Sequence, residues 1–303
     1  MPHAFKLVAL AALCATAAAA HADVGLDANL ELDTTYTNAV DEPATNARDS
    51  DLSMGGRVEF NIGAKASNGD AFVAGRASLL LKKDGDTGVD DMWVHFGNAG
   101  MDVKLGRFEA MDLFPLGKDT VVEEAGYSAY KTNKLRGRFG SDTVHSALGI
   151  NAGAARIELG LVYSKDTDAV RGVRPAVSYT TGPVTLRAGV ESVKVVGGGK
   201  SSNGVGLSLG YKLGTDSNLN LNLAKLEDDK SIGVNAVFGP AGVGLIYGKG
   251  ATSADKVTTV YAAYALPLFG VKGATITPAI SYSKGGTSTD GQVAVRARIN
   301  YAF

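Results

Sequence analysis

Residues 205–223 read VGLSLGYKLGTDSNLNLNL, two alternating runs on either side of a short turn. In the first run Val205 and Leu207 share one face, and small residues occupy the positions between the apolar ones. In the second run leucines such as Leu221 alternate with asparagines such as Asn222. A strict period of two is typical of a β-strand with one apolar face. The stretch therefore predicts a β-hairpin.

The same alternation recurs from residue 24 to the last residue, and it predicts sixteen strands. Short turns such as 67–70 and 98–100 alternate with longer polar connections such as 37–52 and 83–88. An even number of strands, with short turns at one end and longer loops at the other, is the signature of a transmembrane β-barrel.

Lipid offers no hydrogen bonds, so a sheet that spans a membrane has to close on itself. The apolar face of each strand would then meet lipid, while the polar face, with Arg, Glu, Asn and Lys, would line a wet interior. The predicted fold is all-β: a closed antiparallel transmembrane β-barrel over residues 23–303. Sixteen strands is the predicted number, with fourteen and eighteen as the alternatives.

One long segment, Lys104–Arg138, breaks the alternation. It carries acidic residues, aromatic residues and a proline. A loop of this length inside a regular β pattern is functional or disordered. The sequence predicts a loop over residues 109–142, and its position relative to the barrel decides its role.

The N-terminus combines the basic Lys6, an apolar run and small residues around His21, which predicts a cleaved signal peptide over residues 1–22. The only cysteine, Cys14, lies within it, so the exported chain would contain no disulfide and no thiol chemistry. A net charge of −1 gives no reason to expect nucleic acid as a partner.

Signals for catalysis are weak. Beyond the signal peptide the histidines are His95 and His145, both at strand positions and neither in a metal-ligand spacing. A barrel enzyme such as a lipase would need a Ser-His pair at the outer surface, and no such pair is apparent. The sequence predicts no enzyme, no cofactor and no metal site.

At this point the chain resembles the Gram-negative outer-membrane porins. The last residues, Tyr301-Ala302-Phe303, resemble the C-terminal signal that the barrel-assembly machinery recognises in that superfamily. The stretches DMWVHFGN (91–98) and DVKLGRFEAMDLFPLGKDTVVEE (102–124) resemble the carbohydrate-selective porins typified by the raffinose porin. The resemblance implies a homotrimer in outer-membrane lipid and lipopolysaccharide, with a third outer loop that folds into the barrel and narrows it.

The loop 109–142 is the third outer loop by count, so the resemblance makes it the constriction loop. Its carboxylates are the predicted acidic side of the constriction: Glu109, Asp112, Asp119, Glu123 and Glu124. The predicted basic side consists of wall or loop-limb arginines: Arg57, Arg76, Arg107, Arg136, Arg138, Arg296 and Arg298. Opposed charge rows would orient polar solutes and set selectivity. The alternative is that these charges only solvate the interior.

Arg107 would face lipid by strict alternation, so we expect a bulge or the end of its strand to turn it toward the pore or the loop. The candidates for stacking on a sugar ring are Trp93, Tyr127 and Tyr130. Phe114 either stacks or anchors the loop to the wall.

The predicted function is passive diffusion of small polar solutes through the outer membrane, with carbohydrates, including oligosaccharides, as the expected class. The alternative is a general ion and small-solute porin without a sugar site.

Overall fold

The structure, a computed structural model, describes residues 23–42, 47–118, 133–140, 142–166, 169–250, 256–285 and 291–303. The predicted signal peptide lies outside these ranges. The strands, in chain order, are β1 (Asp23–Glu42), β2 (Ala47–Asn68), β3 (Ala71–Lys82), β4 (Thr87–Gly97), β5 (Met101–Arg107), β6 (Thr143–Ala152), β7 (Ala155–Ser164), β8 (Val170–Thr181), β9 (Val184–Val195), β10 (Ser202–Gly214), β11 (Ser217–Leu226), β12 (Asp229–Phe238), β13 (Ala241–Lys249), β14 (Lys256–Tyr264), β15 (Leu266–Pro267), β16 (Ala274–Gly285) and β17 (Gln292–Ala302).

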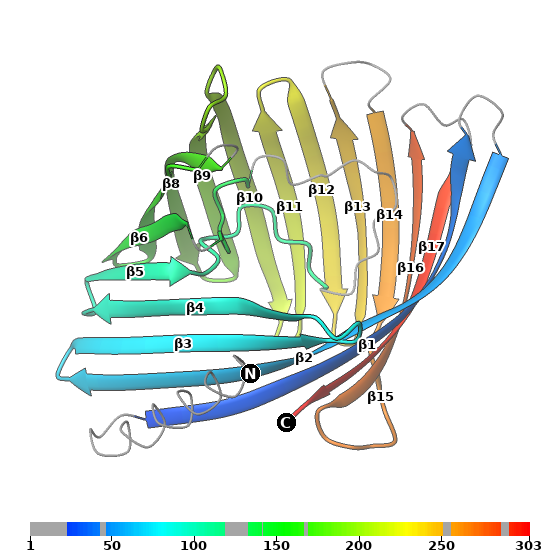
Figure 1. Cartoon of the computed structure of the whole chain (residues 1–303), viewed down its shortest axis with the longest axis horizontal. Helices are drawn as coiled ribbons and strands as arrows, with labels where there is room; N and C mark the ends of the chain where they lie inside the picture. Colours follow the sequence, from blue (N-terminus) through cyan, green and yellow to red (C-terminus); the bar gives the residue numbers. More distant parts are fainter. Residues whose placement is uncertain are drawn as a thin grey trace.

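The strands form a closed antiparallel barrel (Figure 1). Each strand except β14 pairs with the next along the chain, and β17 returns to pair with β1, where Asp33 lies opposite Arg298. β14 and β15 both pair with β16, and a break at Ala265 separates them, so together they act as one strand of the wall. The predicted sixteen-stranded barrel is confirmed.

The two faces of the wall follow the predicted alternation. On the outer face Leu209, Leu221 and Val234 lie side by side in register and are exposed, as lipid-facing residues should be in an isolated chain. On the inner face Ser208 and Asn222, which lie opposite each other, are fully buried. Within the described ranges, no helix has the length and apolar character needed to cross a membrane.

The predicted first outer loop, 37–52, is wrong, because β1 continues to Glu42 and β2 begins at Ala47. These polar residues pair in register up to Val40, opposite Arg48. A strand that extends beyond the bilayer is surrounded by water and needs no apolar face. The sequence here therefore lacks the apolar alternation of a lipid-facing strand, although the backbone continues as a sheet.

The described residues directly after β5, 108–118, fold into the barrel and run along its inner wall (Figure 1). The Pro115 carbonyl accepts hydrogen bonds from Asn222 Nδ2 of β11 at 2.7 Å and Asn235 Nδ2 of β12 at 2.8 Å. Tyr261 of β14 donates to the Leu116 carbonyl at 3.1 Å. The described part of the outgoing limb, 108–118, is therefore held inside the lumen.

Glycines on the inner face make room for this limb. A Cβ at Gly206 of β10 would lie 2.8 Å from the Leu113 side chain, and one at Gly233 of β12 would lie 2.8 Å from the Phe114 ring. Phe114 is 2% exposed and packs against Ala224, Ile246 and Tyr261. This burial makes Phe114 an anchor of the loop.

A buried ion triad on β7, β8 and β9 clamps both limbs of the loop. Arg174 is 1% exposed and lies between Glu158 at 3.8 Å and Glu191 at 3.9 Å. Its Nη2 donates to the Met111 carbonyl at 2.6 Å on the outgoing limb and to Asn133 Oδ1 at 2.9 Å on the returning limb.

The two carboxylates complete the clamp. Glu158 accepts from the backbone N–H of Met111 at 2.8 Å, and Glu191 accepts from those of Lys134 and Leu135, each at 3.1 Å. Three buried wall residues thus hold the loop, mainly by its backbone, and burial requires each of their charges to have a partner.

Leu221→Arg tests the outward face. Leu221 lies near the middle of β11 and is 41% exposed. We expect the arginine to lower the free energy of unfolding in lipid vesicles by about 2–4 kcal/mol, the cost of such a side chain at the bilayer midplane. A urea titration measures it, and the volume-conserving Leu221→Met should cost less than about 1.5 kcal/mol. Equal stability of the two variants would contradict a lipid-facing position.

Arg174→Met tests the clamp. It leaves Glu158 and Glu191 buried without their cation, so we expect a loss of about 3–5 kcal/mol and release of the loop. Leu113→Cys provides the reporter, because Leu113 is 2% exposed and the sequence has a single cysteine, in the predicted signal peptide. A membrane-impermeant thiol reagent should label this cysteine slowly by itself and quickly when Arg174→Met is added.

The matched control adds Glu158→Gln and Glu191→Gln to Arg174→Met, which removes the uncompensated charges and should recover part of the stability. Unchanged labelling of Cys at position 113 in the Arg174→Met variant would show that the triad does not hold the loop.

Candidate functional site

The two limbs of the loop meet beside the ends of β5 and β6. The Ala110 N–H donates to the Arg136 carbonyl at 2.7 Å, and the Arg138 N–H donates to the Phe108 carbonyl at 2.9 Å. This short antiparallel contact brings charges of opposite sign together. Arg136 lies 3.0 Å from Glu109 and 3.6 Å from Asp112.

Arg138 connects the loop to the wall. Its guanidinium lies 3.1 Å from Asp90 and 3.2 Å from Asp91, both on β4, and 3.7 Å from Glu109 on the outgoing limb. Burial alone would lower the pKa of Arg138, but these three carboxylates raise it above its ordinary value. Arg138 therefore stays cationic and holds the loop against β4.

The ion pairs continue across the wall from β4 to β2. Arg76 lies 3.9 Å from Asp91 and 3.8 Å from Glu59. Arg57 lies 3.7 Å from Glu59 and 3.2 Å from Glu31 on β1. Acid and base alternate along this series of contacts, with Arg57 and Glu59 both on β2.

The series ends across the seam between the first and last strands. Arg298 of β17 makes two hydrogen bonds to Asp33, of 2.7 and 2.8 Å, and lies 3.7 Å from Glu31. Arg296 donates to Thr35 Oγ1 at 3.4 Å.

We call the connected set the mixed-charge belt. Its members are Asp33, Arg298, Glu31, Arg57, Glu59, Arg76, Asp91, Asp90, Arg138, Glu109, Arg136 and Asp112. It runs over the inner faces of β17 and β1–β4 and onto the loop. Each charge has a neighbour of opposite sign, so the fields are strong within a few ångströms and weak beyond the Debye length.

The belt differs in arrangement from the predicted rows. The prediction takes its acids from the loop alone and its bases from the wall and the returning limb as separate, opposed rows, whereas the structure intermixes them: Glu109 and Asp112 contact the limb arginine Arg136. Wall carboxylates such as Glu31 and Asp33, which sequence reasoning left out of the site, hold the wall arginines. Their inward parity on the first strand was the signal that could have included them.

Arg107 binds the loop. Its Nε donates to the Val89 carbonyl at 2.9 Å, and its Nη1 donates to the carbonyls of Arg138 and Phe139. β5 ends at Arg107 and pairs with β4 only as far as Met92, so the outer half of β4 has no strand partner on that side among the described residues. Arg107 bridges this gap from β4 to the returning limb.

The aromatic candidates are less open than predicted. Trp93 packs against the cluster of Phe108, Ala110 and Ala147, and Lys104 Nζ lies 4.2 Å over its ring. A sugar would have to compete with that ammonium for this ring face. Several predicted residues lie outside the described ranges: Asp119, Glu123, Glu124, Tyr127 and Tyr130.

The histidines sit in structural surroundings. His145 is 1% exposed, stacks on Phe108 and meets Phe139 edge-on. His95 contacts Asp102 at 2.8 Å, and Arg156 binds the same carboxylate at 2.7 Å. In the part of the chain that the structure describes, no group of three or more His, Cys, Asp or Glu is arranged to hold a metal ion.

Solved structures with the same fold are porins. A substituted form of the Rh. blastica porin matches with a TM-score of 0.66 and 13% identity, covering 93% of this chain and 100% of that one. OmpT, an outer membrane protein of Vibrio cholerae in its trimer form, matches with a TM-score of 0.67 and 15% identity, covering 93% and 99%. At this identity the likeness shows the fold.

No curated protein sequence matches this chain. The family described as "Porin-like glycoporin RafY" matches residues 19–269, which is most of the chain. Together with the closed barrel, this match leads to one conclusion: the chain belongs to the family of porin-like glycoporin RafY and is a multi-pass β-barrel porin of the Gram-negative outer membrane.

Proposed function

We propose that this porin conducts small carbohydrates passively across the outer membrane. The observation that carries the proposal is the mixed-charge belt, which joins the inner wall to an inward-folded loop through pairs such as Arg138–Asp91 and Arg136–Glu109. Opposed charges a few ångströms apart orient water and hydroxyl groups. Because their fields nearly cancel at longer range, they repel neither a neutral solute nor ions of one sign. The name of the family, which describes a glycoporin, points the same way.

The loop sets the width of the path in this proposal. The wall clamp and the Phe114 anchor hold residues 108–118 against β7–β14, so solutes would pass between the loop and the belt side of the wall. Transport of this kind needs no chemistry, and the solute gradient drives it.

The working unit would be a homotrimer in outer-membrane lipid and lipopolysaccharide. The trimer form of OmpT, which shares the fold, supports this assembly. The barrel-assembly machinery would recognise the C-terminal Phe303. In the structure the Phe303 N–H donates to the Ala28 carbonyl at 3.0 Å, so the terminus ends inside the sheet.

A general porin for ions and small solutes is the second candidate. The coverage of Trp93 by Lys104 and the burial of Phe114 favour it, because neither ring is a free stacking platform.

Planar-bilayer recording separates the two candidates. A carbohydrate porin should show a current that a trisaccharide blocks in a concentration-dependent way, because a bound sugar excludes ions from the narrow path. Trp93→Ala should weaken the block and leave the open-channel conductance nearly unchanged. A trisaccharide that never blocks the current would favour the general porin.

Arg296→Gln with Arg298→Gln tests the belt. Without these cations, Asp33 carries uncompensated charge into the lumen, and Glu31 keeps only Arg57 as a cationic partner. We expect the cation-to-anion permeability ratio to rise by roughly fivefold, since a unit charge acts on an ion about 4 Å away with about 1 kcal/mol in water. The reversal potential in a KCl gradient measures the ratio. Arg296→Lys with Arg298→Lys keeps the charge and should leave it close to the parent value; an unchanged potential in the glutamine variant would refute the assignment.

A further inference from the structure

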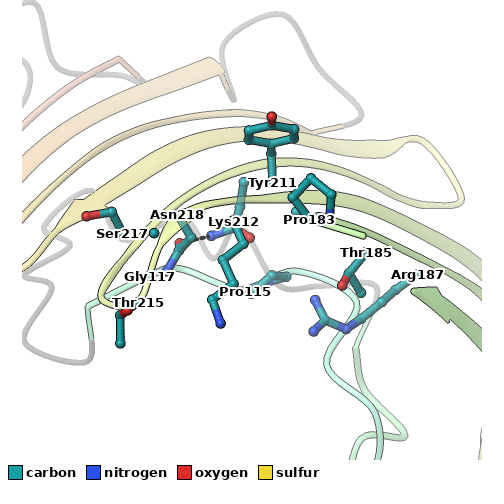
Figure 2. A pocket seen from close by; sticks show the side chains of 13 residues that line it. Pro115, Gly117, Pro183, Thr185, Arg187, Tyr211, Lys212, Thr215, Ser217 and Asn218 are labelled. Carbon is teal, nitrogen blue, oxygen red and sulfur yellow. Dashed lines mark hydrogen bonds between the residues drawn. The ribbon is translucent and has the colours of Figure 1, made fainter. Parts of the chain in front are cut away.

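A second polar site lies on the wall away from the belt. It is a cavity of about 350 Å³ at the ends of β9, β10 and β11 nearest their short turns, 182–183 and 215–216 (Figure 2). Pro115 and Gly117 of the inward loop form one side. Thr185, Arg187 and Lys212 of the wall contribute to the other. The volume falls within the range of about 300–1,000 Å³ that is usual for small-molecule sites.

The described residues that line this cavity carry charges of one sign. Arg187 and Lys212 are the charged ones among them, and none of the described lining residues is a carboxylate. Figure 2 shows the side chains of Thr185, Arg187 and Lys212 extending to the same side of the sheet as the loop, while Tyr211 points to the other side. The nearest acid in sequence, Asp216, belongs to the neighbouring turn and is not part of the lining.

The two cations also differ from those of the belt in their partners. Arg57, Arg76, Arg138 and Arg298 each lie within 4 Å of a carboxylate. Neither Arg187 nor Lys212 has such a neighbour among the residues that the structure describes. Across the strands Arg187 lies opposite Ser178 and Ser208, and Lys212 lies opposite Asn218, all of them uncharged.

The amides beside the cations are oriented by their own hydrogen bonds. Asn220 Nδ2 donates to Asn218 Oδ1 at 3.0 Å and to Asn235 Oδ1 at 2.8 Å. In these bonds the amide oxygens of Asn218 and Asn235 are the acceptors, so the donor group of Asn218, its Nδ2, is not used in them. The same asparagine ladder fixes the loop side of the cavity, because Asn235 also donates to the Pro115 carbonyl at 2.8 Å.

A guanidinium, an ammonium and amide N–H groups are all donors, and two of them are cationic. Such a set recognises an anionic group with several oxygens. These oxygens accept paired hydrogen bonds from arginine and are attracted by the compact positive charge of lysine. A neutral sugar would leave both cations uncompensated.

We propose that this cavity is an anion subsite, which binds the carboxylate or phosphate group of a small hydrophilic solute as it passes between the loop and the short turns. The proposal rests on the function as a solute channel and adds a substrate class to it: acidic or phosphorylated sugars in addition to neutral ones. The belt, where each cation is already paired, would act on hydroxyl groups, and the subsite on the anionic group.

The test uses the full-length protein in planar bilayers, with three solutes that share the hexose ring: glucose, glucuronate, which is close to it in size, and glucose 6-phosphate. We expect the two anions to block the current at concentrations where glucose does not, and the block to weaken at higher ionic strength. Comparing the block by glucuronate with the block by glucose 6-phosphate shows whether the site prefers a carboxylate or a phosphate.

Arg187→Gln with Lys212→Gln should raise the half-blocking concentration of the anions by about tenfold, the effect of losing charge-assisted hydrogen bonds. Arg187→Lys with Lys212→Arg should keep most of the block. Lys230→Gln is the matched control: it removes one positive charge from the outward face of β12, so the block should not change.

Block by glucose equal to that by the anions, or block unaffected by the double glutamine variant, would overturn the proposal. If the double variant forms no channels, Lys212→Gln alone decides, because Lys212 is exposed and its replacement disturbs no packing; an unchanged block in that variant overturns the proposal as well. Absence of any conductance in the parent protein would instead contradict the channel function itself.

Discussion

A backbone that crosses lipid has to satisfy its own hydrogen bonds, and in this chain the pairing of β1 with β17 completes that requirement. Once the sheet is closed, one face of every strand meets lipid and the other faces water. Leu209 and Leu221 belong to the first face and Ser208 and Asn222 to the second. All of the chemistry of this protein is consequently confined to the inner wall and the loop that lies against it.

The inner wall is divided into two parts with different roles. From β17 to β4 it carries long charged side chains, paired into the mixed-charge belt. From β9 to β13, apart from Arg187, Glu191 and Lys212, it carries mainly small or uncharged side chains, and glycine and asparagine leave space for the loop and hydrogen bonds for its carbonyls, as at Gly206 and Asn222. The buried Arg174 lies between these regions and holds both limbs of the loop. The space between the belt and the loop is therefore bounded by charged side chains on one side and by the loop on the other.

The sequence predicted the barrel because period-two alternation and turn chemistry act locally, within a dozen residues. It also predicted that Arg57 and Arg76 face inward, since parity alone places them there. It failed at 37–52, where strands surrounded by water show no lipid-facing pattern.

The partners within the site could not be predicted. The contact of Arg298 with Asp33 depends on the register across the seam, between residues far apart in the chain. The path of the loop depends on inward glycines such as Gly233, which in a sequence indicate a weak strand and not a space reserved for Phe114. Local rules thus describe the wall, while long-range register and packing determine what the wall encloses.

The seam also has a consequence for folding kinetics. Every other strand pairing joins neighbours in the chain and can form as a hairpin, whereas the seam joins residues such as Asn29 and Ala302. Contacts between such distant residues form slowly, because the entropy of the intervening chain has to be lost before they are made. Until they form, β1 and β17 are open sheet edges that can pair with another chain. The growing barrel is therefore most vulnerable to aggregation just before its two ends meet, and a cell that makes it benefits from guiding that last step.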